Sequence, residues 1–141
     1  MRIAVIGAGN SGLATAAYFK KYGYFVTLWN RTEKNIANLK QSRRIKVLGI
    51  WDTTFIVDIV TSDIKEAIQG VDLILVTTPS DSHKDIARLI APYVKEESII
   101  IDVGLGDVLI DSDNISYTPK TKGIGPLSID CLLENLVKNI Y

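Results

Sequence analysis

Three glycines near the amino terminus are the residues whose type and spacing most clearly suggest chemistry. Gly7, Gly9 and Gly12 follow a short apolar run, residues 3–6, in the pattern G-x-G-x-x-G. Glycine permits tight turns and close approach of the backbone to a ligand. A helix that opens here would point the N–H groups of its first turn, around Asn10 and Ser11, at an anion. The motif therefore predicts a phosphate site.

A strand before the glycines, and a helix and a second strand after them, must position this site. The run 3–6 is typical of a strand covered on both faces, the alanine-rich stretch 13–22 of a helix, and the β-branched and aromatic stretch 24–29 of another strand. In this setting the first glycine would permit the turn, the second would clear space for a pyrophosphate, and the third would let the helix pack closely on the sheet. The sequence favours dinucleotide binding over a turn that uses glycine only for its geometry.

The end of the second strand bears on which dinucleotide is bound. A domain that binds NAD commonly places Asp or Glu there, where it accepts hydrogen bonds from the adenosine ribose. This chain has Asn30, Arg31 and Thr32 instead, with Lys34 close by. Arg31 can pair with a 2′-phosphate, and the two polar side chains can hydrogen-bond it. We predict NADP as the cofactor; the alternative is NAD, with Asn30 on its ribose and Arg31 solvated.

Two later strand ends are expected to face the same crevice. In an open α/β sheet, ligands bind outside the carboxyl ends of the strands, near the point where the strand order reverses. We therefore expect Thr78 and Pro79 to line the cofactor crevice, and Val103 and Gly104 to approach the nicotinamide. Ser80 is expected to cap the helix that follows.

One histidine, His83, lies in the first turn of that helix. A helix N-terminus disfavours its protonation, and no carboxylate lies at a spacing that would make it a catalytic base. We expect His83 to pack near the cofactor or at the surface, and we assign no chemistry to Asp102. No catalytic residue and no metal ligand is assigned in this chain.

The rest of the chain continues the alternation of strand and helix patterns. This succession predicts the α/β class, with a doubly wound, mostly parallel sheet and an inserted β-hairpin. Ile86, Leu89 and Ile90 would form the buried stripe of the last clear helix. Strands are expected at 45–49, 55–60, 71–76 and 98–103, and helices at 32–40 with Thr32 as cap, 61–68 and 81–91.

Beyond residue 104 the pattern weakens. A loop, one possible strand at 115–117 and a helical spacing over 127–140 follow. We expect a single domain over 1–141, with its core in 2–104.

Composition narrows the class of protein. The 141 residues, 47% hydrophobic and 23% charged, are ordinary for a soluble globular domain. Sixteen basic and sixteen acidic residues cancel, so no basic excess points to nucleic acid or an anionic membrane. A single cysteine fits the reducing cytoplasm, and no apolar run approaches the length of a membrane span.

The motifs described above, taken together, resemble those of a known family. Over residues 2–104 the chain looks like the amino-terminal domain of NAD(P)-dependent opine dehydrogenases of the octopine and nopaline type. That group is similar to glycerol-3-phosphate dehydrogenases and ketopantoate reductases. The ending LWNR, the hairpin and the pattern P-S-x-x-H-x-x-I-A are the more specific features. The resemblance implies a Rossmann domain followed by a mostly helical domain, and reductive condensation of an amino acid with a 2-keto acid. The cofactor positions that carry over are Gly7, Gly9, Gly12, Asn30, Arg31, Thr78 and Pro79.

The family's substrate and acid/base residues, including a His–Asp pair, belong to the helical domain, and nothing after residue 125 corresponds to it. The asparagine-proline-glycine run of these enzymes is also missing. We therefore expect the cofactor domain of an opine-dehydrogenase-like oxidoreductase that acts on CH–NH or CH–OH donors and is incomplete as a catalyst alone. Its partners would be a nicotinamide dinucleotide and either a second copy or a separate helical substrate domain. The alternative is a non-catalytic module that senses NAD(P) or dimerises through the stretch 127–140.

Overall fold

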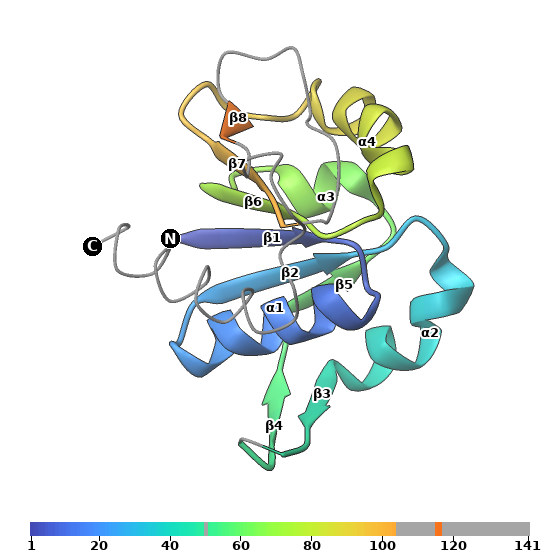
Figure 1. Cartoon of the computed structure of the whole chain (residues 1–141), viewed down its shortest axis with the longest axis vertical. Helices are drawn as coiled ribbons and strands as arrows, with labels where there is room; N and C mark the ends of the chain where they lie inside the picture. Colours follow the sequence, from blue (N-terminus) through green and yellow to red (C-terminus); the bar gives the residue numbers. More distant parts are fainter. Residues whose placement is uncertain (50, 104–114, 117–141) are drawn as a thin grey trace.

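The computed structural model describes residues 1–49, 51–103 and 115–116 (Figure 1). The expected loop at 105–114 and the expected helix at 127–140 lie outside the described residues. The strands are β1 (Arg2–Ile6), β2 (Phe25–Trp29), β3 (Arg44–Val47), β4 (Thr53–Ile56), β5 (Ile59–Thr61), β6 (Leu73–Val76), β7 (Ile99–Asp102) and β8 (Ile115–Ser116). The helices are α1 (Asn10–Lys21), α2 (Glu33–Ser42), α3 (Ile64–Ile68), α4 (His83–Ile90) and a short 3₁₀ turn, η1 (Ser80–Ser82).

The described strands form one parallel sheet in the order β5-β2-β1-β6-β7-β8 and a separate antiparallel hairpin of β3 and β4. The strand order reverses at β1, because the chain runs outward from β1 to β5 and then returns to β6 on the other side. The predicted doubly wound parallel sheet with an inserted hairpin is confirmed. Figure 1 shows the hairpin extending beyond the sheet next to α1.

Both faces of the central strand β1 are buried, and alternate residues belong to different cores. Ile3 and Val5 pack in the core that includes α1 and the hairpin. Ala4 and Ile6 pack in the core that includes α3 and α4. Successive side chains of a strand point to opposite faces, so a continuous apolar run is what a doubly covered strand requires.

The helix after the glycines begins earlier than its apolar spacing predicted. α1 starts at Asn10, so that Gly12 lies inside its first turn. It ends where expected: Tyr22 is the C-cap, and Gly23 adopts a φ of 80°, a conformation that suits glycine. The amide of Tyr24 then donates to the carbonyl of Phe19.

The expected single strand over 55–60 is wrong, because two strands of different sheets occupy this stretch. β4 pairs with β3, whereas β5 pairs in parallel with β2. Asp58 lies at the break, where its Oδ2 accepts hydrogen bonds from the amide of Val26 and from Nζ of Lys20, each at 2.8 Å. Because the carboxylate of Asp58 binds the backbone of β2, the hairpin strand β4 ends before it.

Of three further expectations about α2 and α4, the N-cap position of Thr32 is confirmed and two about α4 are corrected. Thr32 and Ser82 are the N-caps of these helices, and neither side chain makes a capping hydrogen bond. Ser80 begins η1 instead of capping α4, and the hydroxyl of Ser82 donates to the carbonyl of Pro79 at 2.7 Å. Leu89 is 38% exposed, while Ile86 and Ile90 are buried as predicted.

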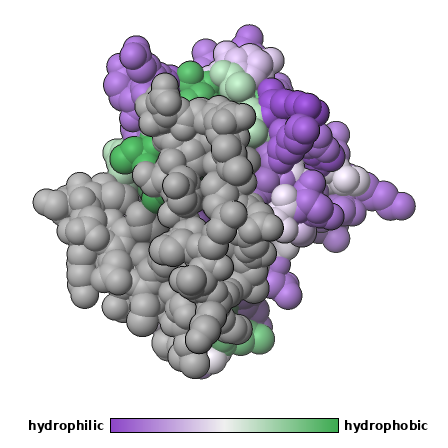
Figure 2. Space-filling model, turned by 45° about the horizontal axis from the view of Figure 1, so that its top comes forward, coloured by the Kyte–Doolittle hydropathy of each residue, from purple (hydrophilic) through white to green (hydrophobic). Residues whose placement is uncertain are grey.

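Polar residues cover most of the described surface that faces the viewer in Figure 2. Among the described residues, no helix is both long and apolar enough to span a bilayer.

Candidate functional site

The predicted cofactor residues come from four strands that end in the same row of the sheet. Ile6 pairs with Trp29 on one side and with Val76 on the other, and Val76 pairs with Asp102. Each ladder continues one residue further through the amides of Gly7, Thr77 and Val103, which donate to neighbouring strands at 2.8–2.9 Å. The structure therefore brings the carboxyl ends of β1, β2, β6 and β7 to one edge, at the reversal of strand order.

Two of the three glycines are required by contacts within the protein. Gly7 has a φ of 115°, and a side chain there would come within 2.8 Å of the hydroxyl of Thr77. A Cβ on Gly12 would overlap the carbonyl of Gly7. The Thr77 hydroxyl donates to the carbonyl of Ile6 at 3.0 Å and lies 3.3 Å from that of Gly7. These contacts hold the start of α1 tightly against the ends of β1 and β6.

Gly9 differs from the other two glycines. It has an extended backbone, with φ −75° and ψ −174°, and a Cβ on it would meet no atom within 4 Å. The open space lies before the first turn of α1, which carries no acidic residue. Asn10 and Ser11 occupy that turn and are exposed. The unpaired N–H groups of a helix start, free of negative side chains and facing open space, fit a phosphate.

A buried hydroxyl on the neighbouring strand end also fits a polar ligand. Oγ1 of Thr78 is inaccessible and has no hydrogen-bond partner. The side chain of Thr78 lies beside Gly7, since its Cγ2 would be 3.0 Å from a Cβ placed there. Buried hydroxyls are nearly always hydrogen-bonded in native proteins. A dinucleotide held at the glycine loop would supply the missing partner with a phosphate or ribose oxygen, so the residues present fit this group.

The end of β2 carries basic and neutral polar side chains. The side chain of Asn30 donates from Nδ2 to the carbonyl of Thr32 at 3.1 Å. The backbone N–H of Asn30 donates to the carbonyl of Thr61 in β5. Arg31 is exposed and makes no hydrogen bond or ion pair within the described part of the chain. Glu33, the first residue of α2, lies 2.8 Å from Nζ of Lys40. The hydrogen bond from Lys40, aided by its charge, lowers the pKa of Glu33, so this carboxylate is ionised and already balanced.

The turn between β6 and α4 is held by His83, whose environment the sequence did not reveal. Nε2 of His83 lies 2.8 Å from the carbonyl oxygen of Thr78. Nδ1 lies 3.4 Å from Oδ2 of Asp102. Both side chains are almost fully buried, 3% and 2% exposed. No spacing in the sequence pointed to this carboxylate, because the pairing of β6 with β7 brings it from the next strand.

The remaining predicted positions differ in accessibility. Pro79 is exposed at the turn, and Val103 is buried directly after β7, in the core on the α1 side. Gly104 lies outside the described residues. Val103 therefore directly follows β7 at the same sheet edge as Thr77, with its side chain in the core.

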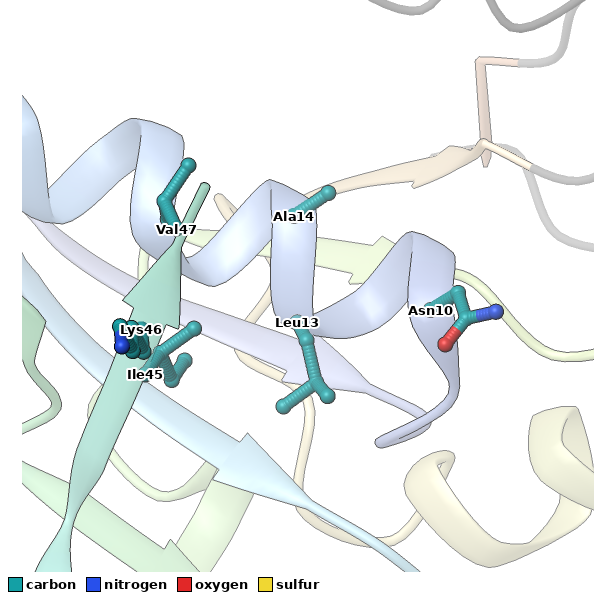
Figure 3. A pocket seen from close by; sticks show the side chains of 6 residues that line it. All are labelled: Asn10, Leu13, Ala14, Ile45, Lys46 and Val47. Atoms are coloured by element: carbon teal, nitrogen blue, oxygen red, sulfur yellow. The ribbon is translucent and has the colours of Figure 1, made fainter. Parts of the chain in front are cut away.

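An open pocket of about 260 Å³ lies between the first turns of α1 and the hairpin. Figure 3 shows Leu13 extending from α1 toward β3, whereas the amide of Asn10 points away from Ile45. The lining is mostly apolar where α1 faces β3, and Asn10 extends it to the first turn of α1. Its lining residues are Asn10, Leu13, Ala14, Ile45, Lys46 and Val47.

The sheet order, the glycine turn and the row of strand ends define a Rossmann-type domain. A family model described as the NAD-dependent glycerol-3-phosphate dehydrogenase N-terminus matches residues 2–128. The match covers most of the chain, and the chain belongs to this family.

Individual relatives agree with this assignment. A glycerol-3-phosphate dehydrogenase [NAD(P)+] from Fusobacterium nucleatum is 30% identical over 107 residues, covering 75% of this chain and 32% of the relative. An opine dehydrogenase from Arthrobacter sp. is 36% identical over 100 residues, covering 70% of this chain and 28% of the relative. The crystal structure of a ketopantoate reductase from Ralstonia eutropha matches with a TM-score of 0.63 and 23% identity, over 75% of this chain and 35% of that one.

The resemblance to all three groups, drawn from sequence alone, is thus confirmed. The chain spans about a third of the length of the curated relatives it matches.

Proposed function

We propose that the chain binds a nicotinamide dinucleotide at the glycine loop, as the cofactor domain of an opine-dehydrogenase-like oxidoreductase that acts on CH–NH or CH–OH donors. The observation that carries this proposal is the open space beside Gly9. This glycine is the N-cap of α1. The buried, unpartnered hydroxyl of Thr78 on the facing strand end supports it. Gly7, Gly12, Asn10 and Ser11 would shape and donate to the pyrophosphate site, and Pro79, Val103 and Gly104 would border the crevice.

We infer further that NADP(H) is preferred to NAD(H). A 2′-phosphate at the end of β2 would meet Arg31, which is exposed and has no ion pair in the described part of the chain. The nearest acidic residue along the chain, Glu33, is balanced by Lys40. Asn30 and Thr32 add hydrogen-bonding capacity, and none of the three residues that follow β2 is acidic.

The domain would bind and orient the dinucleotide, and the nicotinamide would carry the hydride. We propose that the acid/base and substrate groups come from a separate helical domain, and that the 141 residues, a single domain, bind the cofactor with little turnover alone. On the single cysteine, a cytoplasmic location is the expected one.

Parallel titrations of the chain with NADPH and NADH test the proposal, followed by nicotinamide fluorescence or calorimetry. We expect both to bind, NADPH more tightly. Arg31→Ala should weaken NADPH binding about tenfold, the scale of a charge-assisted hydrogen bond, and leave NADH unchanged. Lys46→Ala, an exposed cation on the hairpin, is the matched control. A wild-type preference for NADH, or equal affinities in Arg31→Ala and wild type, would overturn the NADP assignment.

A further inference from the structure

The buried pair of His83 and Asp102 is not explained by core packing alone. Both side chains are removed from water, and burying ionisable groups is costly unless they are held by polar partners. The pair joins two neighbouring strand ends: His83 opens α4 after β6, and Asp102 ends β7 in register with Val76. It therefore lies directly beneath the turn that borders the proposed cofactor crevice.

The two polar contacts of His83 select one orientation of its ring. A carbonyl can only accept a hydrogen bond, so Nε2 carries the hydrogen that is donated to Thr78. The opposite nitrogen, Nδ1, faces the carboxylate of Asp102 at 3.4 Å. A flip of the ring would place carbon atoms against both the carbonyl and the carboxylate. Nδ1 makes no hydrogen bond at this distance, and two acceptors would repel each other. Asp102 therefore helps to hold the imidazole against Thr78 when Nδ1 also carries a hydrogen, which faces the carboxylate.

The contact from His83 sets the direction of the Thr78 peptide. Its carbonyl is turned toward the buried imidazole, which binds this partial negative charge. The methyl group of the same residue lies beside Gly7, and its hydroxyl is buried without a partner. Nearby, Thr77 is fixed to the carbonyls of Ile6 and Gly7. The turn after β6 thus presents the hydroxyls of Thr77 and Thr78 as hydrogen-bond donors, while the carbonyl of Thr78 is bound by His83.

We propose that His83, oriented by Asp102, is a positioning residue for dinucleotide binding. It acts through Thr78, whose carbonyl it holds inward so that the hydroxyl meets a phosphate or ribose oxygen of the ligand. Neither His83 nor Asp102 touches the ligand in this arrangement. The inference rests on the proposed dinucleotide site at the glycine loop.

Replacing the imidazole tests this role in the 141-residue chain with NADPH and NADH as the probes. His83→Leu removes the donor to Thr78, and the dissociation constant for the preferred dinucleotide should rise about tenfold or more. His83→Gln places an amide N–H near the position of Nε2, and binding should recover to within about threefold of wild type. Asp102→Asn keeps the shape of the side chain but removes the negative charge that favours a hydrogen on Nδ1, and it should weaken binding about threefold through a less restricted ring.

Ser98→Ala is the matched control, because it also removes a buried side-chain hydrogen bond to a backbone carbonyl. The Ser98 hydroxyl is buried and donates to the carbonyl of Val71 at 2.8 Å, at the opposite edge of the same sheet. This variant should lower the melting temperature and leave the dissociation constant unchanged. A merely structural role for His83 would give the same result in His83→Leu, and that result would overturn the inference.

The remaining outcomes are also decisive. If His83→Leu does not fold, an unchanged dissociation constant in Asp102→Asn overturns the inference, and the expected weakening supports it. If the wild-type chain binds neither dinucleotide, the proposed function and this inference fall together. If the wild type binds and all His83 variants bind equally, only the positioning role is lost.

Discussion

The α-carbon of Gly12 faces the carbonyl oxygen of Gly7 so closely that a methyl group on Gly12 would overlap that oxygen. The first helical turn and the end of β1 are thus in backbone contact. Because the third glycine is needed by the fold and the second by the proposed ligand, substitutions at the two should separate stability from binding.

Gly12→Ala should destabilise the domain by at least about 2 kcal/mol, because the added methyl meets backbone, which cannot rotate away. The free energy of unfolding in urea, followed by circular dichroism, measures this effect. A loss below about 0.5 kcal/mol, within the range of neutral surface changes, would show that α1 can shift away from the sheet.

Gly9→Ala should have the opposite profile. Its backbone conformation is open to any residue, and the new Cβ meets nothing. Stability should fall by no more than about 1 kcal/mol, the cost of alanine at an N-cap. Dinucleotide affinity should fall about tenfold or more, because the methyl occupies the space expected for the pyrophosphate. An unchanged dissociation constant would place the phosphates elsewhere.

Asp58→Ala should destabilise the chain by about 2 kcal/mol. It removes the acceptor for the amide of Val26 and for Nζ of Lys20, and both donors are partly buried. Thermal unfolding measures this loss. Lys40→Ala breaks the exposed pair with Glu33 and should have little effect, so similar losses in the two variants would contradict a special role for Asp58.

The carboxylate of Asp72 predicts a pH dependence of stability. Its pKa is lowered chiefly by the hydrogen bond from the amide of Arg2, with a smaller contribution from Lys95. A group with a lowered folded-state pKa stabilises the protein above its ordinary pKa of 3.8 and loses that effect as the pH falls through the folded-state value.

Asp72→Asn should therefore melt lower than wild type near neutral pH, and the difference should vanish in acid. The side chain is half exposed, so the effect should stay below about 1 kcal/mol. Melting temperatures from neutral to strongly acidic pH measure it. A difference that persists after the carboxyl is protonated would mean that the amide disturbs packing.

The unit from β1 to β2 could be predicted because its signals are local. An apolar run, glycine spacing and an alanine-rich helix ending at Gly23 each constrain their own segment. The break at Asp58 could not be predicted in this way, since its reason is the amide of Val26, a distant partner. The apolar residues on either side of Asp58 read as one strand although they serve two sheets.

The candidate site likewise has one part that could be predicted from the sequence and one part that could not. The strand ends could be located because parallel sheets place ligands at their carboxyl edge. The contact of His83 with Asp102 depends also on the register of β6 with β7, which no spacing in the sequence encodes. Its only local signal was a histidine three residues after Ser80, at the start of a helix with a strong apolar stripe.

The central position of β1 has a consequence for synthesis on the ribosome. β1 pairs with β6, some 70 residues later, through contacts such as Ile3 with Leu73. Until Thr77 has left the exit tunnel, the carbonyls of Ile6 and Gly7 have no hydroxyl to bind, and one edge of β1 is bare. The nascent glycine turn is thus completed late, and a chaperone that covers exposed strand edges would have its longest access to this segment.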